Sequence, residues 1–280
     1  MFNLSTIYRP LTSQNPIIEN RYEPCSELKP YIVTFWGTQG VNSDKVIESA
    51  PLLVIPDTCV DIIFEMDYRN NRFSGHYYGI NDRPFMADTV VETPFISTFA
   101  IRFHFWAVHL FSDSSLKDSL NISANADDYF YDWNIFFESL MLSTSTLMER
   151  VPIAERFLLS KLNLDKSSTS ILNAAYAIVN SKGTNMVKDV CSYSVVSQRQ
   201  MERLFLTHIG TSIKKVSKLV RYQHVWQEII YQKEFNVQDA VVKYGYTDQS
   251  HLINEFKKYH SMTPNQARLF ARNQLSKYIK

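Results

Sequence analysis

The sequence predicts an α+β protein made of a small β-barrel or β-sandwich that ends in helices, followed by an all-α domain. Apolar residues alternate with polar ones, in short runs separated by turn residues, through much of the first 126 positions. From about residue 127 the apolar period becomes three to four. The net charge also changes sign, because residues 1–170 carry 13 Lys/Arg and 21 Asp/Glu, whereas residues 171–280 carry 16 and 7. An acidic front half and a basic back half suggest that only the back half meets a polyanion.

Four segments of the first half are expected to be strands, namely 31–36, 51–56, 59–66 and 99–106. They are rich in β-branched and aromatic residues, and a Pro-Asp-Thr turn separates the second from the third. In residues 99–106 every odd-numbered position is Phe or Ile, so one face of that strand is fully apolar. Short strands without long helices between them indicate a barrel or a sandwich.

The first half is expected to end in two amphipathic helices between about 127 and 164. Pro152 suits the first position of the second helix, since proline lacks the N–H that a helix start leaves unpaired. The polar run at 164–170 lies where the charge changes sign. We therefore place a β-rich effector or dimerisation domain at 1–165 and an all-α domain at 171–280.

The second half is punctuated by helix caps. Ser170 is expected to cap a helix that stops near Gly183, and Ser197 stands three residues before Gln200, the spacing of a capping box. The helix that Ser197 starts ends at Gly210.

The same pattern then recurs about fifty residues later. A long helix from about 212 to 232 leads to a short one at 237–245, and Thr247 or Asp248 caps the next. Two units of short helix, turn and exposed helix indicate a duplicated helix-turn-helix, and the long helix of about 30 Å could set the ~34 Å between successive major grooves.

Composition excludes several other classes of protein. The apolar share of 45% and the charged share of 20% are those of a folded chain, not of a disordered one. Cys25, Cys59 and Cys191 are too few and too scattered for a disulfide framework or a cysteine zinc cluster. With no signal peptide and no membrane-length apolar run, a cytoplasmic protein is expected.

An enzyme is not expected. His76, His104 and His109 lack the spacing of a metal site, and no nucleophile elbow, phosphate loop or HExxH motif is present. The sequence therefore predicts neither a bound metal nor a cofactor.

The stretch from 239 to 268, DAVVKYGYTDQSHLINEFKKYHSMTPNQAR, resembles the second helix-turn-helix and closing signature of AraC/XylS-type transcription regulators. Residues 187–229 are similar to the first unit and the linking helix of that family. Ser261 replaces a usual Gly, Cys191 a usual small Ala, and Leu206 and Thr207 typical basic residues. The matching positions are Ala240, Gly245, Tyr246, Ser250, His251, Phe256, Lys257, Thr263, Pro264 and Arg268.

The front half resembles, more loosely, the sensor domain of a subset of these regulators. It shares an early YRP, a YI-x-x-FW strand and a VIPD-x-CVDIIFE hairpin, although Thr58 stands where Gly is frequent. The resemblance implies a DNA-binding regulator, an activator with RNA polymerase as a further partner, although the residues do not distinguish activation from repression. The partner of the basic domain is expected to be double-stranded DNA.

The outward residues of the two exposed helices are the expected DNA contacts. Arg203 suits a guanine edge, Asn254 an adenine, and Ile253 a thymine methyl. Lys257 and Lys258 suit phosphates. The full set is Gln198, Arg199, Glu202, Arg203, Gln249, Ser250, Ile253, Asn254, Lys257 and Lys258.

The front half is expected to bind a small-molecule effector. Trp36, Asp61, Arg102, His104 and Trp106 would line the pocket, although the same residues could form a wet outer face. The alternative is a ligand-independent regulator whose front half only dimerises or binds a protein.

A homodimer is expected through the helices between Tyr129 and Leu164, whose apolar supply exceeds what covering a small barrel requires. The alternative is that these residues simply cover one open face of the sheet. The six residues concerned are Phe136, Phe137, Leu140, Leu147, Phe157 and Leu158.

Overall fold

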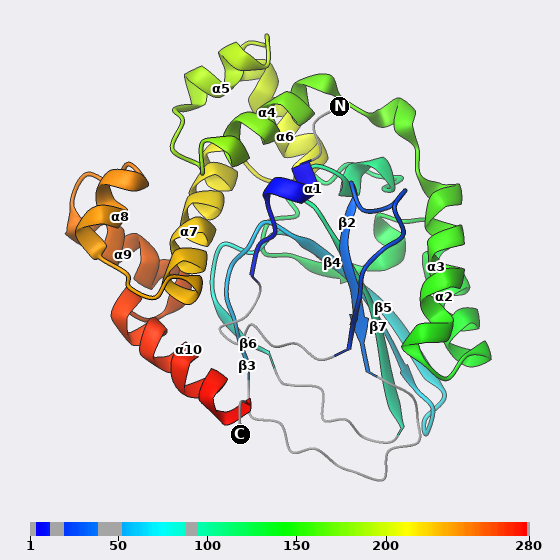
Figure 1. Cartoon of the computed structure of the whole chain (residues 1–280). Coiled ribbons are helices and arrows are strands. Elements are labelled where there is room, and N and C mark those ends of the chain that lie inside the picture. Colours follow the sequence, from blue (N-terminus) through cyan, green and yellow to red (C-terminus); the bar gives the residue numbers. More distant parts are fainter. Residues whose placement is uncertain (1–3, 12–19, 39–51, 88–94, 279–280) are drawn as a thin grey trace.

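A six-stranded antiparallel sheet forms the centre of the front half in the computed structural model, which describes residues 4–11, 20–38, 52–87 and 95–278 (Figure 1). Its strand order is β1-β2-β7-β4-β5-β8, and β3 pairs with β6 separately. In the part of the chain described, β1 and β8 do not pair, so the sheet is sandwich-like and not a closed barrel. The strands are β1 (Arg21–Tyr22), β2 (Ile32–Gly37), β3 (Leu52–Val54), β4 (Val60–Asp67), β5 (Arg72–Tyr78), β6 (Phe85–Ala87), β7 (Ile96–Phe103) and β8 (Ser123–Asn125).

Three of the four expected strands lie close to their predicted ranges, but Pro51 is outside the described residues. The fourth prediction, 99–106, is wrong at its end because β7 stops at Phe103. Its partner β2 begins only at Ile32, which pairs with Phe103, so residues 104–106 have no strand to pair with. The chain turns there, where the Ala107 N–H donates to the carbonyl of His104 at 3.0 Å.

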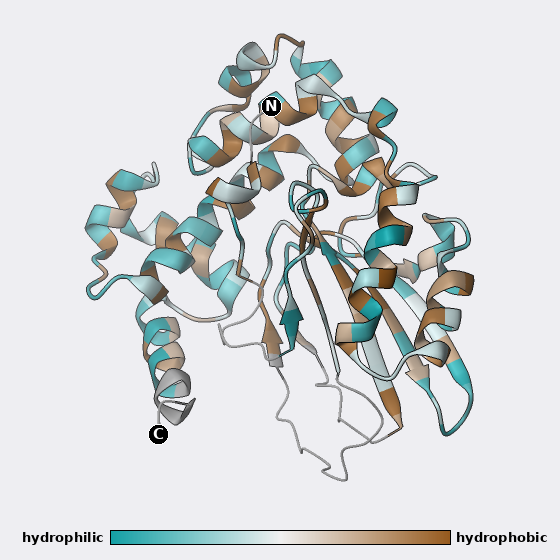
Figure 2. Ribbon diagram, turned by 45° about the vertical axis from the view of Figure 1, so that its right-hand side comes forward, coloured by the Kyte–Doolittle hydropathy of each residue, from teal (hydrophilic) through white to brown (hydrophobic). Residues whose placement is uncertain are grey.

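Helices α2 (Trp133–Ser143) and α3 (Leu147–Lys161) cover one face of the sheet (Figures 1 and 2). Phe137 of α2 stacks on Phe64 of β4 with 4.0 Å between ring centroids. Four of the six apolar residues expected at a dimer contact are fully buried, and Phe136 and Phe157 pack against the same core. These six side chains therefore cover the sheet, which was the alternative, because the open sheet leaves a whole face to bury.

Helix α3 begins five residues before the predicted start at Pro152. Thr146 and Glu149 form a reciprocal capping box, in which each side chain accepts a bond from the other's backbone N–H. This cap starts the helix at Leu147 and leaves Pro152 inside it.

The back half is helical, as predicted. Ser168, not Ser170, caps its first helix, because the Ser168 side chain accepts from the N–H of Ile171. The caps predicted at Ser197 and Gly210 are confirmed, and Asp248 is the cap of the later unit. The helices are α4 (Thr169–Asn180), α5 (Val187–Tyr193), α6 (Gln198–Ile209), α7 (Ile213–Tyr231), α8 (Val237–Lys243), α9 (Gln249–His260) and α10 (Pro264–Tyr278).

A short amino-terminal segment lies between the two halves (Figure 1). Its helix α1 (Leu4–Ile7) packs on α4, and Leu4 and Tyr8 are buried. Short 3-10 helices complete the fold at Val108–Leu110, Ala126–Asp128 and Leu164–Lys166.

Candidate nucleic-acid interface

The first candidate reading helix is α6, which follows α5 after a tight turn. Its apolar stripe, Met201, Phe205 and Ile209, is buried in the domain core. The Ser197 hydroxyl accepts from the N–H of Gln200 at 3.2 Å and fixes the start of the helix. On the opposite side Gln198, Arg199 and Arg203 are exposed, and Glu202 is half-buried. The predicted DNA contacts of this unit therefore share the outward face of one helix.

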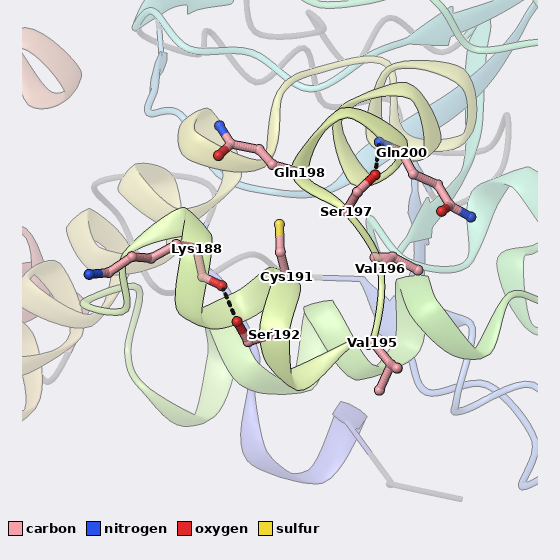
Figure 3. A pocket seen from close by; sticks show the side chains of 8 residues that line it. All are labelled: Lys188, Cys191, Ser192, Val195, Val196, Ser197, Gln198 and Gln200. Atoms are coloured by element: carbon pink, nitrogen blue, oxygen red, sulfur yellow. Dashed lines mark hydrogen bonds between the residues drawn. The ribbon is translucent and has the colours of Figure 1, made fainter.

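An open groove of about 520 Å³ lies between α5 and the start of α6 (Figure 3). Cys191 points into it from α5, and Gln198 and Gln200 extend from α6 in different directions. Burial raises the pKa of the Cys191 thiol, so the thiol stays neutral at physiological pH. Val195 at the turn is highly exposed and has a φ of 55°, a conformation that a β-branched residue rarely adopts.

The second candidate reading helix, α9, repeats this arrangement after α8. Leu252, Phe256 and Tyr259 are buried. Ser261 ends the helix with a φ of 60°, which explains why glycine is usual at this position. The predicted contacts Gln249, Ser250, Asn254, Lys257 and Lys258 are exposed, and Ile253 is half-buried.

Helix α7 joins the two units and spans 19 residues, which corresponds to about 28 Å. Both reading helices pack against it. Within the described residues, Arg199, Arg203 and Lys257 form no ion pair, so their charges are available to a ligand.

Family comparisons agree with this geometry. Residues 190–269 match a helix-turn-helix domain of the AraC type, and these residues include both reading helices. The chain therefore contains a helix-turn-helix domain of the AraC type. Residues 20–123 match a domain of unknown function, DUF6597, that covers most of the sheet. No protein with a curated description matches the chain.

Solved structures of regulators resemble the chain weakly. ToxT of Vibrio cholerae, bound to (E)-4-(8-methylnaphthalen-1-yl)but-3-enoic acid, is 13% identical over 85% of this chain and 99% of its own, with a TM-score of 0.41. A second ToxT structure gives 12% identity, 84% and 98% coverage and a TM-score of 0.39. The xylose-binding transcription activator XylR is 15% identical, with a TM-score of 0.32, over 43% of this chain. The chain spans 37% of the length of XylR.

The structure brings three of the five predicted effector residues together on one face of the sheet. Arg102 pairs with Asp57 and lies 3.4 Å from Asp61, and the Trp36 indole donates to Asp61 at 3.4 Å. Burial opposes the charge of Arg102, but the two carboxylates more than offset it and raise the Arg102 pKa. Asp57 was not predicted as part of this cluster.

His104 and Trp106 lie beyond the end of β7, and within the described residues no hydrogen bond or ion pair joins them to that cluster. Their rings stack on each other at 4.3 Å, and both are buried. The Trp106 indole donates to the carbonyl of Pro30 at 3.0 Å. Burial lowers the pKa of His104 to about 3, so this side chain is a neutral packing residue.

A buried glutamine joins the sheet domain to α7, and no local pattern in the sequence indicates it. Gln223 is fully buried and its amide donates to the carbonyls of Leu11 and Pro56, both at 2.8 Å. Its side-chain oxygen accepts from the Leu11 N–H at 2.8 Å.

Pro56 and Thr58 flank Asp57, and the Thr58 hydroxyl donates to Tyr8 at 3.2 Å. The turn 56–58 therefore contacts both the Arg102 cluster and the segments around α7.

The sheet domain also contacts α7 and the end of α6. Lys215 of α7 pairs with Asp82 at 2.7 Å. Burial opposes ionisation of Asp82, but Lys215 and Asn121 more than offset this effect and lower its pKa. At the end of α6, the Thr207 carbonyl accepts from the Leu116 N–H at 2.9 Å, and His208 lies against His109 with 5.0 Å between ring centroids.

The residues that the structure describes contain neither a membrane-spanning helix nor a cluster of metal-binding side chains. No helix among them is long and apolar enough to cross a bilayer. They contain no group of three or more His, Cys, Asp or Glu side chains placed to hold a metal ion.

The burial of His109 predicts that the stability of the protein depends on pH. Burial, and then His208, lower the pKa of His109 to about 3, whereas an unfolded histidine titrates near 6.5. The unfolded state therefore takes up a proton that the native state refuses. We expect stability to fall by roughly 1.4 kcal/mol per pH unit for this residue as the pH drops below about 6.

Urea denaturation at pH 7, 6 and 5 measures this loss. His109→Gln removes the titrating ring and should flatten the dependence by about that slope. An unchanged slope in His109→Gln would contradict the assignment.

Proposed function

We propose that this AraC-type chain is a sequence-specific, double-stranded-DNA-binding transcription regulator. One observation carries the proposal. Two equivalent helices, α6 and α9, both pack on the linking helix α7, bury their own apolar stripes and expose their own polar and basic side chains. Arg203 would read a base edge through its guanidinium, and Lys257 would hold a phosphate. The excess of positive charge in residues 171–280 supports the same partner.

The Arg102 cluster supports an effector site on the sheet face that α2 and α3 leave uncovered. Trp36 supplies an aromatic surface there, and Asp61 and Arg102 supply polar groups that would orient a small polar ligand. A ligand that moved Asp57 would act on the turn 56–58, and through Gln223 on α7. The effector would change DNA affinity only by its different affinities for the two arrangements of this junction. The alternative is a ligand-independent regulator whose front half only dimerises or binds a protein.

A homodimer is proposed through the outward faces of α2 and α3, not through the six residues that cover the sheet. Ile135 and Leu142 are two turns apart on α2 and highly exposed, and Met148 and Leu159 share a stripe of α3. Two copies would bury these stripes and offer four reading helices to repeated half-sites.

We expect the full chain to bind duplex DNA with an affinity that falls steeply with salt, with a log-log slope of about −0.9 for each phosphate neutralised. Lys257→Ala should reduce that slope by about one and weaken all sequences alike. Arg203→Ala should instead cost about 1–3 kcal/mol and remove discrimination at one base pair. Titrations of both variants on single-base operator variants measure this. Identical effects of the two substitutions would contradict the roles, and a salt-independent affinity would sink the function.

A native-state ligand should raise the thermal midpoint of the full chain in a metabolite panel, since a ligand at 100 times its Kd adds about 2.7 kcal/mol of stability. Asp61→Asn should lose the shift because it removes a charge from the site. Its matched control, Asp67→Asn on the same strand, should keep it. If no metabolite shifts the wild type, the ligand-independent alternative is favoured.

Sedimentation tests the dimer. The full chain should sediment as a dimer at micromolar concentration, and Ile135→Glu should shift it to the monomer because a carboxylate would be buried in the contact. Val242→Glu on α8 is the control, because it places the same carboxylate at a highly exposed apolar position outside both stripes. A wild-type monomer would leave α2 and α3 with only their covering role.

A further inference from the structure

The contact between α7 and the second reading helix, α9, has an apolar part and a polar part. In the apolar part, Trp226 and Tyr222 pack on Phe256, and the Tyr222 hydroxyl lies 2.8 Å from Nδ1 of His260. Apolar packing of this kind is strong but does not depend on direction, so it tolerates small rotations. The Tyr222–His260 hydrogen bond and the polar part therefore supply the directional contacts between the two helices.

The polar part is an ion pair between Arg221 of α7 and Glu255 of α9. Nε and Nη2 of Arg221 both donate to Oε1 of Glu255, at 3.1 and 2.6 Å, and both side chains are largely buried. The Arg221 guanidinium also lies over the Tyr246 ring at 4.2 Å, and Lys218 approaches the other carboxylate oxygen at 3.6 Å. A planar guanidinium held by two bonds and a ring fixes direction as well as distance.

The backbone of Arg221 also lies close to Gly183, which follows α4. Gly183 has a φ of 74°. A Cβ there would lie 2.1 Å from the Ser217 carbonyl oxygen and 2.8 Å from the Arg221 nitrogen, so only glycine allows this approach. Since α4 contacts α5 and α6, and α6 also packs on α7, the stretch of α7 that holds α9 is also held against the first unit.

Glu255 is next to Asn254 and two residues before Lys257, which are exposed on the reading face of α9. A rotation of α9 that broke the Arg221–Glu255 pair would turn these side chains with it. The pair therefore links the direction of the second reading face to the position of the first unit.

We propose that Arg221 and Glu255 are positioning residues. They set which spacing the chain accepts between two DNA half-sites, one read by α6 and one by α9 of the same chain. The inference rests on the proposed function. Neither residue contacts DNA in this role, and each acts through α9. With the pair intact, a shift of one base pair, about 3.4 Å and 34°, takes the second half-site out of register with α9.

Selection from a random duplex pool tests the proposal, because it requires no known operator. The full-length wild type should select two half-sites at one spacing. The double variant Arg221→Met with Glu255→Met replaces the buried pair by apolar side chains and leaves no buried unpaired charge, because Lys218 is solvent-exposed, so it should fold. It should select the same half-sites at scattered spacings.

Binding titrations on duplexes with the spacing changed by one base pair give the magnitude. We expect the wild type to lose about tenfold or more in affinity and the double variant less than about threefold, with half-site affinities unchanged. Glu255→Gln keeps the acceptor oxygen and should retain most of the preference, which gives a second reading if the double variant misfolds. Lys257→Gln, a phosphate-contact control, should weaken all spacings equally.

The outcomes separate the two proposals. A double variant that keeps the full wild-type preference overturns the positioning role while DNA binding stands. So does a Glu255→Ala variant that keeps the preference as fully as Glu255→Gln does, since alanine removes the acceptor oxygen. A wild type that binds half-sites regardless of spacing also overturns it. A wild type that binds no duplex removes the proposed function, and this inference falls with it.

Discussion

Helix α7 is buried from two sides at once, and that constraint organises the back half and its attachment to the front. One side carries Gln223, whose three hydrogen bonds satisfy backbone groups of the sheet domain. Another carries Tyr222, Trp226 and Arg221, which hold α9. A buried amide left without partners costs more than the bonds themselves contribute, so the junction favours a single arrangement. Neither reading unit can then be repositioned without disturbing a buried contact of the same helix.

Charge is distributed unequally over this arrangement. Asp82 of the sheet domain pairs with Lys215 of α7, whereas Arg199, Arg203 and Lys257 are exposed and form no ion pair within the described residues. One lysine of the helical domain therefore contributes to the contact between the domains, and these three basic side chains stay available for the DNA contact that we propose.

Local signals in the sequence predicted the helical domain well because its caps are short-range. Ser197 and Asp248 each accept from a backbone N–H three residues later, and the Gly210 N–H donates to Phe205 five residues earlier, so their positions can be read directly. The end of β7 could not be predicted in the same way, since it depends on where the partner strand β2 begins. Gln223 was missed because its partners are 212 and 167 residues away. Glu255 left one signal: it occupies the place that the half-buried Leu204 takes in the first unit, and a carboxylate at a half-apolar position needs a partner.

The short segment of residues 4–11 has a consequence for how the protein is made. It is made before its partners on α7, because the Arg9 carbonyl and the Leu11 backbone bond the side chains of Gln227 and Gln223. Tyr8 likewise rests against His224. During translation these contacts form only after α7 has emerged, so the joining of the two halves follows the synthesis of both. A fusion partner attached at the amino terminus would therefore interfere with the final assembly step more than with the folding of either half.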